Sequence, residues 1–142
     1  MARAPFCPPP IAKPGFQLAI ALVIIDQLSK WAMVNRLDLP NRGSIEITSF
    51  LSWTWVENRG ISWGFFAVDN DMLRWLLVVA TGLIAFWIAI WLKNSATKAE
   101  ALTFGLVFGG AIGNIIDRAR LGYVVDFIDF NLGDWRPFLV FN

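Results

Sequence analysis

Four polar side chains gather between Gly113 and Phe127, just after a long apolar run. They are Asn114, Asp117, Arg118 and Asp126. A charged or strongly polar side chain inside a membrane costs about 3 kcal/mol or more unless it is paired or faces a polar interior. Two carboxylates near apolar walls do not both ionise easily, so one proton is shared and the pair can act as acid and base on a water molecule. The stretch therefore predicts a polar site, with peptide-bond hydrolysis as one of several chemistries open to it.

A plainer interpretation of the same stretch is a charged stop at the membrane boundary. That interpretation accounts for Arg118 and Arg120, but it leaves Asp126 unexplained inside the extended apolar sequence YVVDFIDF. The other carboxylates nearby are interpreted as solvated or structural: Glu57, Asp129 and Asp134.

The composition excludes several classes of protein and site. The chain has 142 residues, of which 56% are hydrophobic and 16% charged, and its mean hydropathy is +0.54. These values are typical of a small integral membrane protein. The net charge of +1 argues against nucleic-acid binding. There is no histidine and one cysteine, Cys7, so we expect no metal site and no cofactor.

Three apolar runs are long enough, or nearly so, to cross a bilayer, which takes about 20 residues. They occupy residues 16–34, 75–92 and 101–116. We expect a single all-α membrane domain in which a disordered cytoplasmic tail (1–15) precedes the first span. A segment facing the outside (35–74) and a short cytoplasmic loop (93–100) separate the spans, and residues 117–142 again lie outside.

The orientation follows from the basic residues near the ends of the spans. Arg3 and Lys13 in the tail have no acidic neighbour, and Lys93 and Lys98 outnumber Glu100 in the short loop. These parts are therefore expected in the cytoplasm. Trp31, Trp75 and Trp135 are expected at the outer interface, and Trp87 and Trp91 at the inner one.

The outer segment has the pattern of a small β-structure. Asp38–Gly43 (DLPNRG) is a turn signal, and apolar residues alternate with polar ones between Ser44 and Glu57. We expect one or two strands there, on the outer membrane surface, followed by a turn into Ile61–Phe66 (ISWGFF).

Two further patterns lie inside the apolar runs. Asp26 and Lys30 are four residues apart and share a helix face, where they can form an ion pair. That pair fits a purely structural role and a role close to chemistry equally well. A stripe of small residues leads to Asp117 at a spacing of four: Ala101, Gly105, Gly109 and Gly113. Such a stripe permits close helix packing, which we favour over direct contact with a substrate.

Five motifs, in order along the chain, resemble those of the bacterial signal peptidase II family, the lipoprotein signal peptidases. They are DQLSK in the first run, ENRGISWGFF in the outer segment, GGAIGNIIDR at the end of the third run, GYVVDFIDF after it, and FN at the end. The resemblance extends from Asp26 to Asn142. It implies a four-helix aspartyl endopeptidase of the bacterial inner membrane, with both termini in the cytoplasm and its active site at the outer face.

The resemblance also implies a substrate and a set of site residues. The substrate would be a diacylglyceryl-modified prolipoprotein, cut just before the lipid-modified cysteine, and the enzyme would be a monomer in contact with membrane lipid. Asp126, in VVDF, corresponds to one of the two catalytic aspartates of the family. The supporting or substrate-binding positions would be Asp26, Lys30, Asn58, Gly60, Asn114, Asp117, Arg118 and Asn142.

The last motif is incomplete. In the family the second catalytic aspartate follows the asparagine of this motif by three residues, so it is expected beyond Asn142, with a fourth span after it. We expect a truncated sequence rather than a natural stop, because every other motif is intact. The chain as written, with Asp126 alone, is expected not to cleave peptides.

The hypothesis for the complete site is a pair of aspartates that share a proton and hold a water molecule. One deprotonates the water while the other protonates the scissile carbonyl oxygen, which gives a gem-diol without metal or covalent adduct. The alternative is a non-enzymatic multi-pass protein, such as an assembly factor or transporter subunit, whose charged residues join helices. A transport path would place polar residues along a whole span, whereas here they gather at the outer end.

Overall fold

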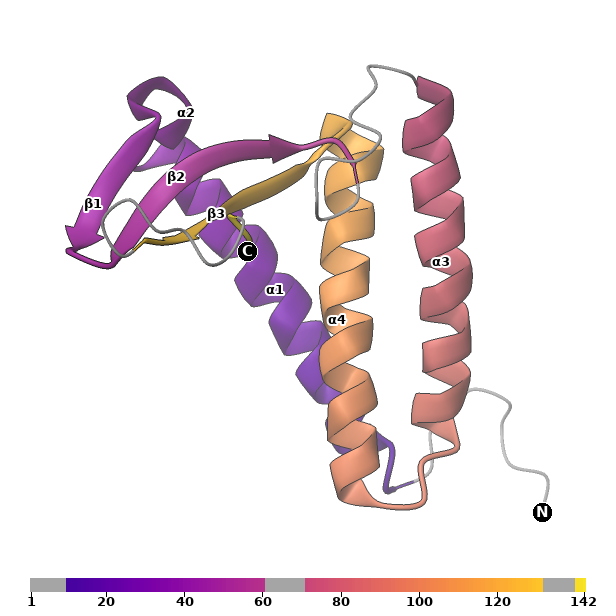
Figure 1. Cartoon of the computed structure of the whole chain (residues 1–142). Coiled ribbons are helices and arrows are strands. Elements are labelled where there is room, and N and C mark those ends of the chain that lie inside the picture. The colour runs from indigo at the N-terminus through magenta and orange to yellow at the C-terminus, as the bar shows by residue number, and fades with distance from the viewer. Residues whose placement is uncertain (1–9, 61–70, 132–139) are drawn as a thin grey trace, which may run out of the picture.

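The computed structural model describes residues 10–60, 71–131 and 140–142, and within them three long helices carry a small sheet at one end (Figure 1). The long helices are α1 (Lys13–Asn35), α3 (Asp71–Lys93) and α4 (Lys98–Leu121). Each is long and apolar enough to cross a membrane. The predicted fold class, helical membrane spans with a small β-structure, is confirmed. The expected ISWGFF turn (61–66), Trp135, Cys7 and residues 1–9 of the tail lie outside the described residues.

Each long helix extends beyond the apolar run that predicted it. Helix α1 includes residues 13–15, which the sequence assigned to the tail, and Pro14 lies in its first turn, where a missing N–H costs nothing. Helix α4 continues past Ile116 through Asp117 and Arg118 to Leu121. It ends where Gly122 adopts a φ of 89°. The backbone hydrogen bonds of a helix can continue through polar residues, so the end of an apolar run does not mark the end of a helix.

The sheet has three antiparallel strands in the order β1 (Ser44–Thr48), β2 (Leu51–Asn58) and β3 (Val124–Phe130). β1 and β2 form a hairpin where the alternating pattern predicted one or two strands. β3 follows α3 and α4 in the sequence, yet it pairs with β2. In this pairing Val56 lies opposite Asp126 and Asn58 opposite Val124. A short helix, α2 (Leu39–Arg42), connects α1 to the hairpin.

One face of the sheet packs on the C-terminal end of α1. The buried side chains there are Met33, Leu39, Val125 and Phe127, and Trp55 and Tyr123 pack against them. Successive side chains of a strand point to opposite faces. Asp126, between Val125 and Phe127, therefore points away from this apolar cluster.

Helices α1 and α4 cross at very close range, and the predicted stripe of small residues lies in the contact. Among the described residues, the buried ones of α4 are Ala101, Gly105, Gly109, Gly113 and Asp117. A Cβ on Gly105 would collide with the backbone of Gly15, and one on Gly109 would lie 2.9 Å from the carbonyl oxygen of Ala19. The expected role of the stripe in helix packing is confirmed.

We predict that Gly105→Ala lowers the free energy of unfolding by about 1–3 kcal/mol, because the added methyl group forces the two backbones apart. Gly110→Ala is the matched control, since a Cβ at Gly110 meets nothing within 4 Å. The control is expected to be neutral or stabilising by up to about 1 kcal/mol through helix propensity. Unfolding by sodium dodecyl sulfate in mixed micelles, followed by circular dichroism, measures both. Equal effects of the two substitutions would contradict the conclusion that the glycines allow α1 and α4 to pack closely.

Candidate active site

Asp126 lies on β3 and is 5% exposed. Its Oδ2 accepts a hydrogen bond of 2.9 Å from Nδ2 of Asn58, at the end of β2. Burial raises the pKa of the Asp126 carboxyl above its ordinary value, and the nearby charge of Asp117 raises it further. The Asn58 bond and the charges of Lys30 and Arg118 lower the pKa by less. Asp126 is therefore a carboxyl that holds its proton more firmly than an exposed aspartate does.

The amide of Asn58 connects Asp126 to the end of α4. Its Oδ1 accepts a hydrogen bond from the backbone N–H of Gly60 at 3.1 Å. The carbonyl oxygen of Gly60 in turn accepts from Nη2 of Arg118 at 3.0 Å. These contacts join three expected site residues, Asn58, Gly60 and Arg118, to Asp126 in one continuous chain. The two bonds of the Asn58 side chain also fix which way its amide faces.

A second polar cluster lies between α1 and α4. The Nζ of Lys30 is 2.8 Å from Oδ1 of Asp26 and 2.6 Å from Oδ2 of Asp117. The predicted pairing of Asp26 with Lys30 is confirmed, and the same ammonium also holds the carboxylate of the neighbouring helix. Gln27 adds two further bonds, from its Nε2 to Asp26 at 3.0 Å and to Asp117 at 2.9 Å.

This cluster is bonded directly to the strand that carries Asp126. The backbone N–H of Val125 donates to Oδ2 of Asp117 at 3.2 Å. The side chain of Asn142 donates to the carbonyl oxygen of Val125 at 3.2 Å and to Oδ1 of Asp26 at 3.4 Å. Helix α1, helix α4 and β3 are thus held at one point, and Asp126 is the next residue of the strand.

Asp117 and Asp126 are not joined to each other by a hydrogen bond in the described part of the chain. Both oxygens of Asp117 are occupied, by Gln27 on one side and by Lys30 and Val125 on the other. The sequence suggested these two carboxylates as a pair that shares a proton. The contacts instead make Asp117 a structural partner of Lys30.

Other expected residues have different surroundings. Asn114 is half-buried in α4, and we find no hydrogen bond from its side chain to any described residue. Asp129 is 1% exposed and accepts from Oγ1 of Thr54 at 3.0 Å, so of its two interpretations the structural one applies. Glu57 pairs with Arg59 at 2.9 Å on the surface. Asp134 lies outside the described residues.

Sequence reasoning missed two residues of this region. Gln27 follows Asp26 directly, but nothing in the sequence shows that its amide reaches a second helix. Arg74, near the start of α3, donates from Nε to the carbonyl oxygen of Arg118 at 2.7 Å and from Nη2 to that of Ala119 at 2.6 Å. It satisfies carbonyl groups that the end of a helix leaves open.

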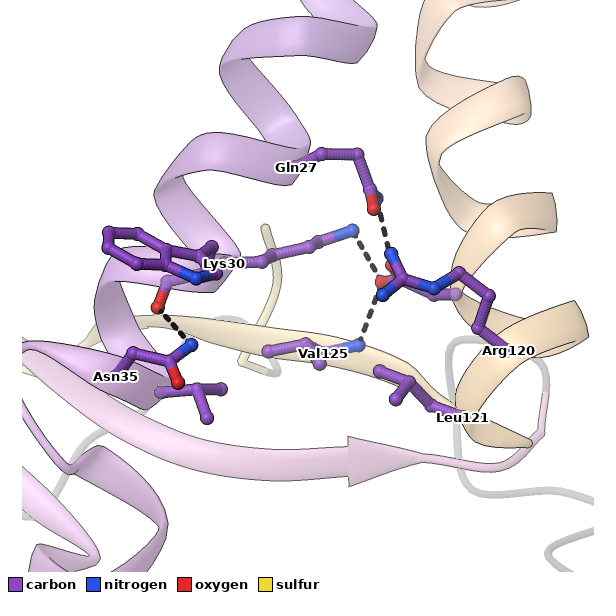
Figure 2. A pocket seen from close by; sticks show the side chains of 9 residues that line it. Gln27, Lys30, Asn35, Arg120, Leu121 and Val125 are labelled. Carbon is purple, nitrogen blue, oxygen red and sulfur yellow. Dashed lines mark hydrogen bonds and ion pairs between the residues drawn. The ribbon is translucent and has the colours of Figure 1, made fainter.

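A pocket of about 160 Å³ opens between the C-terminal ends of α1 and α4 (Figure 2). Gln27, Lys30 and Asp117 line it, and Val125 closes it on the side of β3. Asp126 and Asn58 do not line it, because strand alternation turns Asp126 to the other face. The pocket therefore reaches the ion cluster from behind the strand. Within the described residues, no group of three metal-ligating side chains comes together.

Comparison with known proteins connects this geometry to a family. The profile of the family described as signal peptidase (SPase) II matches residues 18–142. The lipoprotein signal peptidase of Rhizorhabdus wittichii is 52% identical over 128 residues, covering 90% of this chain and 74% of the relative. That of Sphingopyxis alaskensis is 44% identical over 133 residues, covering 94% and 77%. A solved structure of a bacterial membrane enzyme aligns with a TM-score of 0.75 and 30% identity over 92% of this chain and 77% of its own.

We predict that Lys30→Met lowers the free energy of unfolding by about 3 kcal/mol or more, because it leaves the Asp26 and Asp117 carboxylates buried without their cation. Lys98→Met, at the exposed start of α4, is the control and is expected to change the value by about 0.5 kcal/mol or less. Unfolding of both variants in sodium dodecyl sulfate under the same conditions measures the two free energies of unfolding. A loss no larger than that of the control would show that the cluster does not hold the helices together.

We also predict that Asp126→Asn makes the protein more stable at pH 7. The raised pKa means that the folded state binds the proton more tightly than the unfolded state, so the stability that Asp126 contributes is full below its ordinary pKa and is lost as the pH rises through the raised value. The amide removes this loss and keeps an oxygen for Asn58. Unfolding at pH 7 and pH 4 should show a gain that shrinks on acidification. The exposed Glu46→Gln should show no such gain, and a less stable Asp126→Asn at pH 7 would contradict the assignment.

Proposed function

Because this chain belongs to the signal peptidase II family, we propose that it is an aspartyl endopeptidase that uses Asp126 as one of two catalytic carboxylates. The observation that carries the proposal is the difference between Asp126 and the carboxylates beside it. Asp26 and Asp117 are paired with Lys30, whereas Asp126 accepts a bond from an uncharged amide and its pKa is raised. Acid–base catalysis near neutral pH benefits from such a carboxyl, because its pKa is closer to the working pH.

The second carboxylate is expected three residues beyond Asn142. Asn142 is bonded to the carbonyl oxygen of Val125, next to Asp126 in the chain. Three residues extend the backbone by at most about 11 Å. A carboxylate at that position is therefore within reach of Asp126, either directly or through one water molecule.

In the proposed reaction the two carboxylates share one proton. The ionised one removes a proton from a water molecule as it attacks the scissile carbonyl carbon, and the protonated one donates to the carbonyl oxygen, which yields a gem-diol. As the gem-diol collapses and its C–N bond breaks, the carboxyl that took a proton from water donates it to the leaving nitrogen. A gem-diol hydroxyl gives its proton to the other carboxylate, so the pair again holds one proton. Asn58 holds Asp126 in place, and Arg118 fixes the neighbouring turn. The amide of Asn114, which is bonded to no residue that the structure describes, is available to the substrate.

The substrate that fits the family is a prolipoprotein, and we propose that it carries a diacylglyceryl group on the cysteine after the cut. The protein is a membrane protein, and its sheet lies at one end of the long helices (Figure 1). The polar cluster lies at that end, because Asp117 is bonded to Val125 of the sheet. We propose that this end faces the outside of the bacterial inner membrane, with the basic short loop between α3 and α4 in the cytoplasm. The proposed enzyme acts as a monomer.

The non-enzymatic alternative is not favoured. Family membership argues against it, and so does the distribution of charge along the helices. The ion cluster joins α1 and α4 near their outer ends, and α3 has charged residues only in its first and last turns. A polar path through the bilayer would require such groups along the whole length of a helix.

We predict that Asp126→Asn lowers the cleavage rate by about 10²–10⁴-fold, since the amide neither gives nor takes the proton. The assay uses a fluorescent peptide with a diacylglyceryl cysteine in micelles, and the polypeptide is extended through the last motif. Glu46→Gln on β1 serves as the control and is expected to retain the full rate. Chelators should have no effect on either rate. Full activity of the Asp126→Asn variant would rule out the proposed mechanism.

A further inference from the structure

An aromatic and charged cluster lies at the end of β2, outside the proposed catalytic residues. The guanidinium of Arg59 lies over the ring of Tyr123, 5.7 Å from its centroid. The edge of Trp55 meets the same ring at 6.4 Å, with the planes at 85°. Glu57 forms an ion pair with the guanidinium of Arg59 at 2.9 Å. We call these four residues, Trp55, Glu57, Arg59 and Tyr123, the outer brace.

The brace includes Arg59, which belongs to the turn that is bonded to Asp126 through Asn58. Arg59 lies between Asn58 and Gly60, and both of these neighbours belong to the chain of hydrogen bonds from Asp126 to Arg118. Tyr123 precedes β3, the strand that carries Asp126. The contact between Arg59 and Tyr123 therefore joins the two backbone segments whose separation sets the distance from Asn58 to Asp126.

The brace and Asp126 lie on opposite faces of the sheet. Trp55 and Tyr123 pack against the apolar cluster that includes Val125 and Phe127, and strand alternation turns Asp126 and Asn58 to the other side. The brace is thus anchored in packed side chains and does not compete with a substrate for the catalytic face. A cation over an aromatic ring is attracted by the negative face of the ring, so the contact depends on the ring and not on the hydroxyl of Tyr123.

We propose that the stack of Arg59 on Tyr123 is a positioning device, which holds the Asn58–Gly60 turn so that the Asn58 amide presents its N–H to Asp126. This inference rests on the proposed role of Asp126 in catalysis. β2 ends at Asn58, so the ladder of the sheet no longer fixes the residues after it. The stack adds a constraint on Arg59 to the bonds that Asn58 and Arg118 make with Gly60. If the turn rotates, Oδ1 of Asn58 faces the carboxylate in place of its N–H, and the bond is lost.

The test compares two substitutions of one residue. Tyr123→Phe keeps the ring under Arg59, and Tyr123→Leu removes it. We expect Tyr123→Leu and Arg59→Gln to lower kcat by about fivefold each, which is the size of one exposed cation–π contact, with KM unchanged. Tyr123→Phe should match the parent. Detergent unfolding of each variant shows whether it is folded under the assay conditions.

The pH dependence separates positioning from a general loss of structure. The Asn58 bond lowers the pKa of Asp126, so its loss moves the acidic limb of the pH–rate profile to higher pH in Tyr123→Leu. The charged groups that face Asp126, namely Lys30, Arg118 and Asp117, are unchanged in these variants. In an Asn58→Ala background, Tyr123→Leu should shift neither kcat nor the limb any further. Equal effects in both backgrounds, or a Tyr123→Phe variant as impaired as Tyr123→Leu, would overturn the inference.

A titration of Asp126 by carboxyl ¹³C NMR distinguishes this inference from the proposed function. A shift in Tyr123→Leu that is absent in Tyr123→Phe supports the positioning role even if Asp126→Asn leaves cleavage intact and the catalytic role fails. Normal, Asp126-dependent cleavage together with identical titrations in all variants would keep the proposed function and overturn the positioning role.

Discussion

A single ammonium group, that of Lys30, holds two helices and a strand of this membrane protein at one point. Buried charges of one sign repel strongly where water is scarce, so neither Asp26 nor Asp117 is tolerable in the seam without a cation. Lys30 lies 2.8 Å from the first and 2.6 Å from the second. Because one of them comes from its own helix and the other from α4, the same cation that neutralises them also fixes how α1 and α4 meet. Gln27 is bonded to the same two carboxylates, and the backbone N–H of Val125 is bonded to that of Asp117.

The close approach of the two helices is what makes the contact possible. A Cβ on Gly113 would lie 2.5 Å from Oδ2 of Asp26, so a larger residue there would displace the carboxylate that Lys30 holds. Gly105 and Gly109 bring the backbones together further down the seam. Small residues and charged residues therefore serve one arrangement: the first lets the helices touch, and the second determines their register where they touch.

Two kinds of carboxylate result from this arrangement, only a few residues apart in sequence. The carboxylate oxygens of Asp117 are bonded to Lys30, Gln27 and the backbone N–H of Val125, and these bonds anchor β3 to α4. Asp126, one position beyond that anchored backbone, meets an uncharged amide and carries a raised pKa. An anchored strand and a poorly solvated carboxyl on its free face are what a proton-transferring site requires: fixed geometry, and a proton that is neither lost nor held too firmly.

Much of this could be read from the sequence, because it depends on local pattern. Runs of apolar residues predict the three long helices. A spacing of four places Asp26 beside Lys30 and the glycines along one face of their helix, and alternation predicts one or two strands where β1 and β2 form. The tertiary structure alone decided three other points. It made β3 the partner of β2, and it paired Asp117 with Lys30 rather than with Asp126. It also brought Gln27, Arg74 and Arg59 into contact with residues distant in sequence. Periodicity describes a residue relative to its own element. Which carboxylate receives the cation is decided by the other helix that is close enough to present one, and that becomes known only when the elements are packed together.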